Sequence, residues 1–276
     1  MGDRLIGGLA VRERGDPTQA AILLWPGLSS SGAYFDPLAL ALPWRSAAVD
    51  PPGSGGSAPL DPCTSDRLVE LAHHVSKACG CWAVVGHSLG AYVALGLAAN
   101  PPAKLRAAVL IDGGFLSAED YVELGMPVTS GREELTAWMQ ASGPRFPDWD
   151  TAFVQLAAMI GGEVTPALEA YVRDVFAEVD GEVCQRARPD EMAALLLGVI
   201  DHDARARAER IEIPTLLIAC GEPAERRAMR ERAWTQLVQA SPLIELQVVE
   251  GWYHNPILQD PDRASSMIVE WLQAHL

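Results

Sequence analysis

A short apolar run that turns through glycines into a helix is the feature that most constrains how this chain can fold. Residues 82–85 read Trp-Ala-Val-Val, and residues 86–90 read Gly-His-Ser-Leu-Gly. A stretch rich in alanine and glycine follows over residues 89–99. The run predicts a buried strand, and the stretch predicts a helix whose small side chains let it pack close to a sheet. A strand, a sharp turn and a helix in this order predict a protein of the α/β class.

The same alternation continues along the chain, whose 276 residues are enough for one large domain. Helical patterns at residues 64–79 and 262–274 carry apolar residues on one face. Strands that are apolar on both faces are typical of a parallel sheet covered by helices on both sides. The sequence thus predicts a mostly parallel central sheet flanked by helices. Its other strands are predicted at residues 21–25, 46–50, 107–111, 214–219 and 243–249.

The alternation breaks in residues 116–205, where helical patterns predominate and strand signals are few. A helical insertion between two strands of a parallel sheet is most simply a cap over the edge of the sheet where such folds bind ligands. We therefore expect a core of residues 1–115 and 206–276 with a helical cap at 116–205. Bulky side chains of the insertion are expected to form the interior of the cap or to line an apolar pocket. They are Trp138, Phe146, Trp149, Phe153, Met159, Tyr171 and Phe176.

The charge of the chain argues against some classes of partner. Its 36 acidic side chains outnumber 21 basic ones, giving a formal net charge of −15. Such a chain repels phosphate backbones and anionic lipid, so neither nucleic acid nor a membrane surface is an expected partner. The sequence makes no prediction of the oligomeric state.

The expected lack of targeting signals and the pattern of the cysteines predict a cytoplasmic protein. Charged residues interrupt residues 1–20, so no secretory signal is expected there, and no apolar window is long enough to span a bilayer. The odd, scattered set of five cysteines predicts free thiols in a reducing compartment. These are Cys63, Cys79, Cys81, Cys184 and Cys220.

Two weaker clusters are interpreted as structural. The arginines of residues 226–232 could bind a phosphate-bearing carrier arm, but a solvated helix face is the favoured interpretation. That cluster consists of Arg226, Arg227, Arg230 and Arg232. Asp201-His202-Asp203 lacks a second group of metal-binding residues. We therefore expect no metal, and no organic cofactor is implied.

The turn at residues 86–90 points to nucleophilic chemistry at Ser88. A serine between a strand and a helix in such a tight turn has a strained backbone and presents its hydroxyl above the sheet. Gly86 and Gly90 are expected because side chains there would collide with neighbouring backbone. A serine hydroxyl is a poor nucleophile until a base takes its proton, so a histidine partner is required.

Three more motifs make the chain resemble the α/β-hydrolase fold family, and the resemblance covers essentially the whole sequence. Residues 25–28, Trp-Pro-Gly-Leu, match the loop after the third strand of that fold, although a histidine commonly stands where this chain has Trp25. Residues 50–57 match a D-x-P-G-x-G-x-S turn, which is expected to support that loop. Residues 253–256, Tyr-His-Asn-Pro, match the late histidine motif.

The resemblance implies roles for particular residues. His254 would be the base, and the chain's other five histidines fit that place less well. The backbone amides of Leu28 and Leu89 would form the oxyanion hole, so their side-chain identity matters little. Serine at position 88 argues against dehalogenase or epoxide-hydrolase chemistry, because those relatives use a carboxylate nucleophile there.

The acid that should orient His254 is left open by the sequence. Most relatives carry it in a Gly-x-x-Asp turn, but here Ala224 stands at the aspartate position. Glu225 or Glu222 could serve with a shift of that turn. Asp112, at the end of the predicted strand 107–111, is favoured, because some relatives place their acid there. A structural role for Asp112, or no acid at all, is the remaining alternative.

Together these features predict a serine hydrolase that cleaves an ester, thioester or lactone through an acyl-enzyme on Ser88. The expected partner is a small-molecule substrate with an apolar acyl group. The alternatives are a C–C bond hydrolase, a carrier-bound thioesterase of a biosynthetic pathway, and a non-catalytic scaffold with a hydrolase fold.

Overall fold

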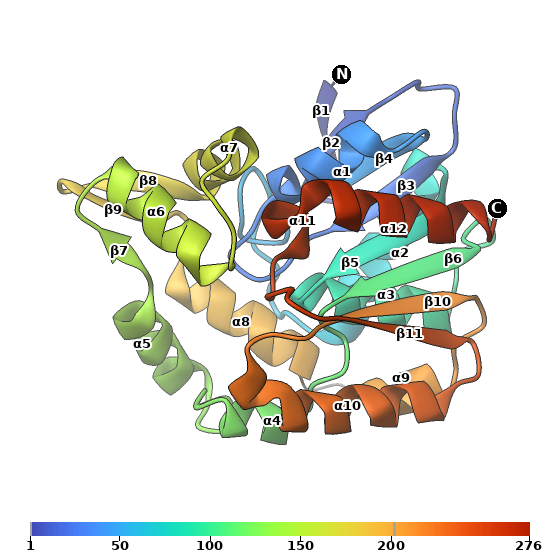
Figure 1. The fold of residues 1–276 in the computed structure, drawn as a ribbon. Coiled ribbons are helices and arrows are strands. Elements are labelled where there is room, and N and C mark those ends of the chain that lie inside the picture. The colour runs from blue at the N-terminus through green and yellow to red at the C-terminus, as the bar shows by residue number, and fades with distance from the viewer. Residues whose placement is uncertain (1, 201–202) are drawn as a thin grey trace.

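The computed structural model describes residues 2–200 and 203–276 and contains an eight-stranded sheet in the order β1-β2-β4-β3-β5-β6-β10-β11 (Figure 1). The six predicted strands are present, and the five pairings among them are all parallel. Every residue of β3, β5, β6 and β10 is buried, as expected for strands covered on both faces. These six strands are β3 (Ala21–Trp25), β4 (Arg45–Val49), β5 (Cys81–His87), β6 (Ala107–Ile111), β10 (Thr215–Cys220) and β11 (Ile244–Val249).

An N-terminal hairpin of β1 (Gly2–Ile6) and β2 (Leu9–Arg14) was not expected and makes the sheet mixed. Strand β2 also pairs antiparallel with β4. The hairpin turns at Gly7 and Gly8, which have φ values of 60° and 87°. Two adjacent residues in this left-handed region are what a two-residue hairpin turn requires, so Gly7-Gly8 was the available signal.

Two apolar cores lie on opposite faces of the sheet. Leu23, Val84 and Leu110 contribute to one core, together with α2, α3 and α10. Leu24 and Val85 contribute to the other, together with α1, α11 and α12 (Figure 1). The helices of the core are α1 (Asp36–Ala41), α2 (Ser65–Cys79), α3 (Leu89–Ala99), α10 (Arg227–Ala240), α11 (Pro256–Gln259) and α12 (Pro261–Gln273), with short 3₁₀ turns η1 (Gly32–Phe35) and η2 (Ala224–Arg226).

The insertion between β6 and β10 is not all helical, which corrects the expectation of a purely helical cap. It contains a small antiparallel sheet in the order β7-β9-β8, whose β8–β9 hairpin turns at Asp180 and Gly181. Both turn residues have positive φ values, 54° and 83°, so the Asp-Gly pair was a hairpin signal. The elements are α4 (Ala118–Glu123), α5 (Arg132–Ser142), β7 (Arg145–Phe146), α6 (Trp149–Met159), α7 (Pro166–Val175), β8 (Phe176–Val179), β9 (Glu182–Gln185) and α8 (Pro189–Ile200).

The insertion is bonded to the loop that follows β3, at the carboxyl end of the sheet. The Tyr171 hydroxyl donates to Ser30 Oγ at 3.0 Å, and Ser31 Oγ donates to Asp174 at 2.5 Å. The side-chain amide of Gln185 donates to Ser29 Oγ in the same loop at 3.2 Å. The insertion therefore lies beside the sheet edge at which the predicted site residues stand (Figure 1).

Helix α9 (Ala204–Ala208) packs against α3 and α10, so the boundary expected at residue 205 falls inside a helix that contacts the core. The five cysteines are free thiols, as expected. No helix in the described ranges is long and apolar enough to cross a bilayer. Asp201 and His202, considered above as metal ligands, lie outside the described residues.

Candidate active site

Ser88 stands alone between β5, which ends at His87, and α3, which begins at Leu89. Its φ and ψ are 54° and −116°, a strained conformation for a residue with a side chain. A β-carbon on Gly86 would collide with the backbone of Gly90, and one on Gly90 would collide with the Trp25 carbonyl. The turn can therefore close only with glycine at both positions, which explains the spacing seen in the sequence.

The structure brings Ser88, His254 and Asp112 together. His254 lies in the loop between β11 and α11, and its Nε2 is 2.9 Å from Ser88 Oγ. Its Nδ1 is 2.6 Å from Asp112 Oδ2. The imidazole is about half exposed (52%), whereas the Asp112 side chain is almost fully buried (3%). These distances are in the range that a nucleophile, its base and the group orienting the base require.

Adjacent strands fix the positions of Ser88 and Asp112. Strands β5 and β6 are in parallel register with His87 opposite Ile111, so each functional residue is the next one along its chain. The Ser88 amide also donates to the Ile111 carbonyl at 2.8 Å. Asp112 reaches the same crevice as Ser88 because the sheet, and not a long loop, positions it.

The Asp112 carboxylate is ionised in spite of its burial. Burial raises the pKa of Asp112, but the hydrogen bond and charge of His254 lower it, as do the Arg230 guanidinium and the Cys220 amide. Their combined effect holds the pKa below the ordinary value of an aspartate. A negative charge at this place stabilises a proton on the neighbouring imidazole.

The two alternative acids do not bond to His254, since both of its ring nitrogens already have partners. Glu225 lies exposed in η2. The Glu222 backbone amide donates to the Trp252 carbonyl at 2.9 Å, and the Glu222 carbonyl accepts a hydrogen bond from Arg230. The geometry therefore favours Asp112 among the three candidates.

His87 has a structural position that the sequence did not reveal. It is buried, and its Nε2 donates to the His254 backbone carbonyl at 2.7 Å. Its ring stacks on Tyr34 with centroids 4.3 Å apart. Burial, with a smaller effect of His254, lowers the pKa of His87 to about 3. His87 is therefore a neutral donor that anchors the backbone of the loop carrying His254.

This burial predicts acid sensitivity. Between about pH 6.5 and about pH 3 the unfolded chain binds a proton that folded His87 excludes, so stability falls as pH falls, by up to about 1.4 kcal/mol per pH unit. His87→Gln, which removes the titrating ring, is expected to reduce the loss of unfolding free energy between about pH 7 and about pH 5 by on the order of 2 kcal/mol. Urea denaturation at the two pH values measures this.

The exposed His74 of α2 supplies the matched control. His74→Gln should keep the pH dependence of the wild-type protein. A His87→Gln variant that loses stability with acid as steeply as the wild type would contradict this account of His87.

The two predicted amide donors belong to segments next to Ser88. Leu89 is the first residue of α3, and Leu28 follows Gly27, where an added β-carbon would lie 3.0 Å from the Ser88 β-carbon. The loop after β3 is held by Asp50, whose carboxylate accepts the amides of Gly32 at 2.8 Å and Gly56 at 2.9 Å. The turn at residues 50–57 thus supports this loop, as the resemblance implied.

The arginine cluster is a solvated face with one exception. Arg226 is exposed, Arg227 pairs with Glu250, and Arg232 pairs with Asp120 and Glu123. Arg230 differs, because it is buried and pairs with the Asp112 carboxylate. The expectation was wrong for Arg230, which lies on the buried face of α10 one turn before Ala233 and Trp234. This helical spacing was the signal that could have identified it.

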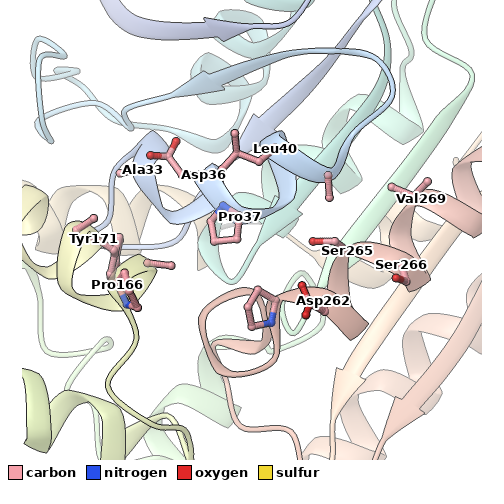
Figure 2. Close-up of a pocket in the computed structure, with 14 residues that line it drawn as sticks. Ala33, Asp36, Pro37, Leu40, Pro166, Tyr171, Asp262, Ser265, Ser266 and Val269 are labelled. Carbon is pink, nitrogen blue, oxygen red and sulfur yellow. The ribbon is translucent and has the colours of Figure 1, made fainter.

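A separate groove of about 890 Å³ lies between α1, α7 and α12 (Figure 2). Its walls are mostly small or apolar, with carboxylates at Asp36 and Asp262. Tyr171 borders it and meets Tyr34 edge-on at 5.9 Å, and Tyr34 in turn stacks on His87. The groove is lined by α1 and α12 of the core and by α7 of the insertion, so it is a seam between insertion and core. Within residues 2–200 and 203–276, no three His, Cys, Asp or Glu side chains cluster as metal ligands.

Comparison with known proteins agrees with this architecture. A family model described as the alpha/beta hydrolase family matches residues 22–265. A pimeloyl-[acyl-carrier protein] methyl ester esterase from Chromobacterium violaceum is 28% identical over 202 residues, which are 71% of this chain and 73% of that protein.

Two solved structures are similar over almost their whole length. The E-2-(acetamidomethylene)succinate hydrolase has a TM-score of 0.74 at 22% identity and covers 96% of this chain and 95% of its own. The thioesterase domain from the curacin biosynthetic pathway has a TM-score of 0.75 at 20% identity, with 97% and 98% covered. At these identities the likeness concerns the fold.

Proposed function

This chain belongs to the alpha/beta hydrolase family, and from that premise we propose that it hydrolyses a carboxylic ester or thioester through an acyl-enzyme on Ser88. The observation that carries the proposal is the hydrogen-bonded series in which His254 lies 2.9 Å from Ser88 and 2.6 Å from Asp112. The similarity to a methyl ester esterase supports the same reaction class.

In the proposed mechanism Ser88 Oγ attacks the acyl carbonyl carbon while His254 Nε2 accepts the hydroxyl proton. The Asp112 carboxylate holds Nδ1–H and stabilises the imidazolium. The amides of Leu28 and Leu89 donate to the oxyanion of the tetrahedral intermediate. His254 then protonates the departing alcohol or thiol, which leaves the acyl group on Ser88.

Water completes the cycle. His254 Nε2 removes a proton from a water molecule that attacks the acyl carbon, and a second tetrahedral intermediate forms. Its collapse releases the carboxylic acid and returns the proton to Ser88 Oγ. Each turnover therefore consumes one water and leaves the enzyme unchanged.

The charge of the insertion favours a small-molecule substrate over one on a phosphate-bearing arm. Residues 116–200 contain fifteen acidic and five basic side chains. A negative surface beside the site repels phosphate. Phe146, Phe153 and Phe176 are buried in the apolar interior of the insertion, so they pack its core, and an apolar acyl group stays a prediction for the ester panel to test.

We propose that the insertion, with the expected boundary at residue 205 moved to before α9, acts as a cap on the core, supported by the hydrogen bonds of Tyr171 and Gln185 to the loop after β3. A cytoplasmic location is supported by the five free thiols.

Two measurements test the proposed function. A fluorophosphonate probe should label the wild-type protein, because only an activated serine reacts with it. A panel of p-nitrophenyl esters and acyl thioesters of increasing chain length should then identify a preferred apolar acyl group. A protein that neither labels nor hydrolyses any member of the panel would instead be a non-catalytic scaffold.

A further inference from the structure

Arg230 in the middle of α10 occupies a position that the proposed mechanism does not yet use. Its side chain is only 9% exposed and ion-pairs through Nη2 with Asp112 Oδ1. Its Nη1 donates to the Glu222 backbone carbonyl at 2.8 Å. The guanidinium carbon lies 5.6 Å from the centre of the Trp234 ring. A guanidinium held on three sides in this way has a single orientation.

Both oxygens of the Asp112 carboxylate are consequently fixed. Oδ2 meets His254 Nδ1, while Oδ1 accepts the Cys220 amide at 3.0 Å and pairs with Arg230. Rotation of the carboxylate would break at least one of these bonds. A planar guanidinium suits this task because it can bond a carboxylate and a carbonyl at once.

We propose that Arg230 is a positioning residue that orients the Asp112 carboxylate toward His254 and shares its negative charge. This inference rests on the proposed function, in which His254 is the base. A buried carboxylate with no cation would favour the imidazolium more strongly, and a protonated His254 cannot accept the Ser88 proton. Arg230 therefore keeps the base available at a lower pH than Asp112 alone would allow.

Among residues 2–200 and 203–276, Arg230 is the arginine that pairs with this carboxylate. Burial raises the pKa of the Cys220 thiol and of the Tyr34 phenol well above their usual values. Burial also raises the pKa of Tyr121 to about 12 and lowers that of His87 to about 3. All four groups are therefore neutral near pH 7. The charge balance at the site thus depends on three side chains, Asp112, His254 and Arg230.

Two substitutions separate charge from geometry. Arg230→Gln is neutral but keeps a hydrogen-bond donor, so the acid limb of the kcat/KM profile against pH should move up by about one pH unit. Arg230→Lys keeps the charge, but an ammonium group lacks the planar pair of nitrogens that bonds the Asp112 carboxylate and the Glu222 carbonyl together. Its acid limb should stay at the wild-type pH while kcat falls by roughly 10-fold.

Arg227 is the matched control, because it lies on the same helix and stands 5.5 Å from the same Trp234 ring but pairs with Glu250. Arg227→Gln should leave both the acid limb and kcat unchanged. In an Asp112→Asn background, Arg230→Gln should no longer move the limb, because its effect passes through that carboxylate.

NMR titration of the His254 ring in the resting protein supplies a readout that needs no substrate. Arg230→Gln should shift that titration upward as it shifts the acid limb. An unmoved titration, or a shift that persists with Asp112→Asn, would overturn the role of Arg230. If Arg230→Gln does not fold, the Arg230→Lys variant provides the test. A kcat of Arg230→Lys equal to that of the wild type would refute the positioning role of Arg230. Absence of turnover in the wild type refutes the proposed function alone, and the titration still tests Arg230.

Discussion

Replacing Ser88 by alanine is expected to lower kcat/KM for an activated ester by at least about 10³-fold and to abolish fluorophosphonate labelling. The change removes the single oxygen that faces His254 Nε2, while the imidazole and its carboxylate stay in place. The turn itself should persist, because Gly86 and Gly90 are untouched and alanine adds no volume. Ester hydrolysis and covalent labelling measure the loss, and thermal unfolding checks the fold.

Ser76 provides a control, since it is a buried serine of α2. Ser76→Ala should label and turn over as the wild type does. Substantial turnover retained by Ser88→Ala would show that the nucleophile had been assigned to the wrong residue, whatever the geometry around His254.

The second large effect is expected at Asp112. Asp112→Asn keeps the shape but replaces a charged acceptor by an amide that can favour the wrong imidazole tautomer, and kcat should fall by up to about 10⁴-fold. The same change leaves the Arg230 guanidinium buried without its counter-charge, so unfolding free energy should fall by about 3–5 kcal/mol. Steady-state kinetics and denaturant unfolding measure the two losses separately.

Glu222 and Glu225 serve as paired controls for this experiment. Because neither bonds to His254, Glu222→Gln and Glu225→Gln should have little effect on kcat. A larger loss in Glu225→Gln than in Asp112→Asn would transfer the orienting role to the turn after β10.

The predictable part of the fold was its buried part. Strands such as β5 and β6 are continuous apolar runs bounded by glycine or aspartate, so their pattern has few competing interpretations. The hairpins at Gly7-Gly8 and Asp180-Gly181 were missed because their strands are short and carry exposed charged residues. Without a long apolar run only the turn residues gave a signal, and turn signals alone are weak.

The site residues likewise fall into those that a local motif identifies and those that do not stand in one. Ser88 and His254 stand in motifs whose residue order fixes their place in the fold. Choosing between Asp112 and Glu225 needed the register of β5 against β6, which no local sequence pattern encodes. Arg230 resembles its arginine neighbours in residue type, and its helical spacing with Ala233 and Trp234 was the one local signal that it lies on the buried face of α10. Long-range placement, and not residue chemistry, was the missing information.

The strand order also dictates when the proposed site can come into being. Ser88, Asp112 and the two predicted amide donors all precede the insertion, whereas His254 follows β11. Strand β10 pairs with the free edge of β6 and β11 pairs with β10, so both strands are expected to be in place before the imidazole can reach the serine. In a nascent chain, or in a molecule in which β10 and β11 are detached from the sheet, Ser88 lacks its histidine partner and has the low reactivity of an ordinary serine hydroxyl. Under the proposed mechanism, Ser88 should therefore react with esters only in the fully assembled protein, and a partly assembled chain should not be acylated.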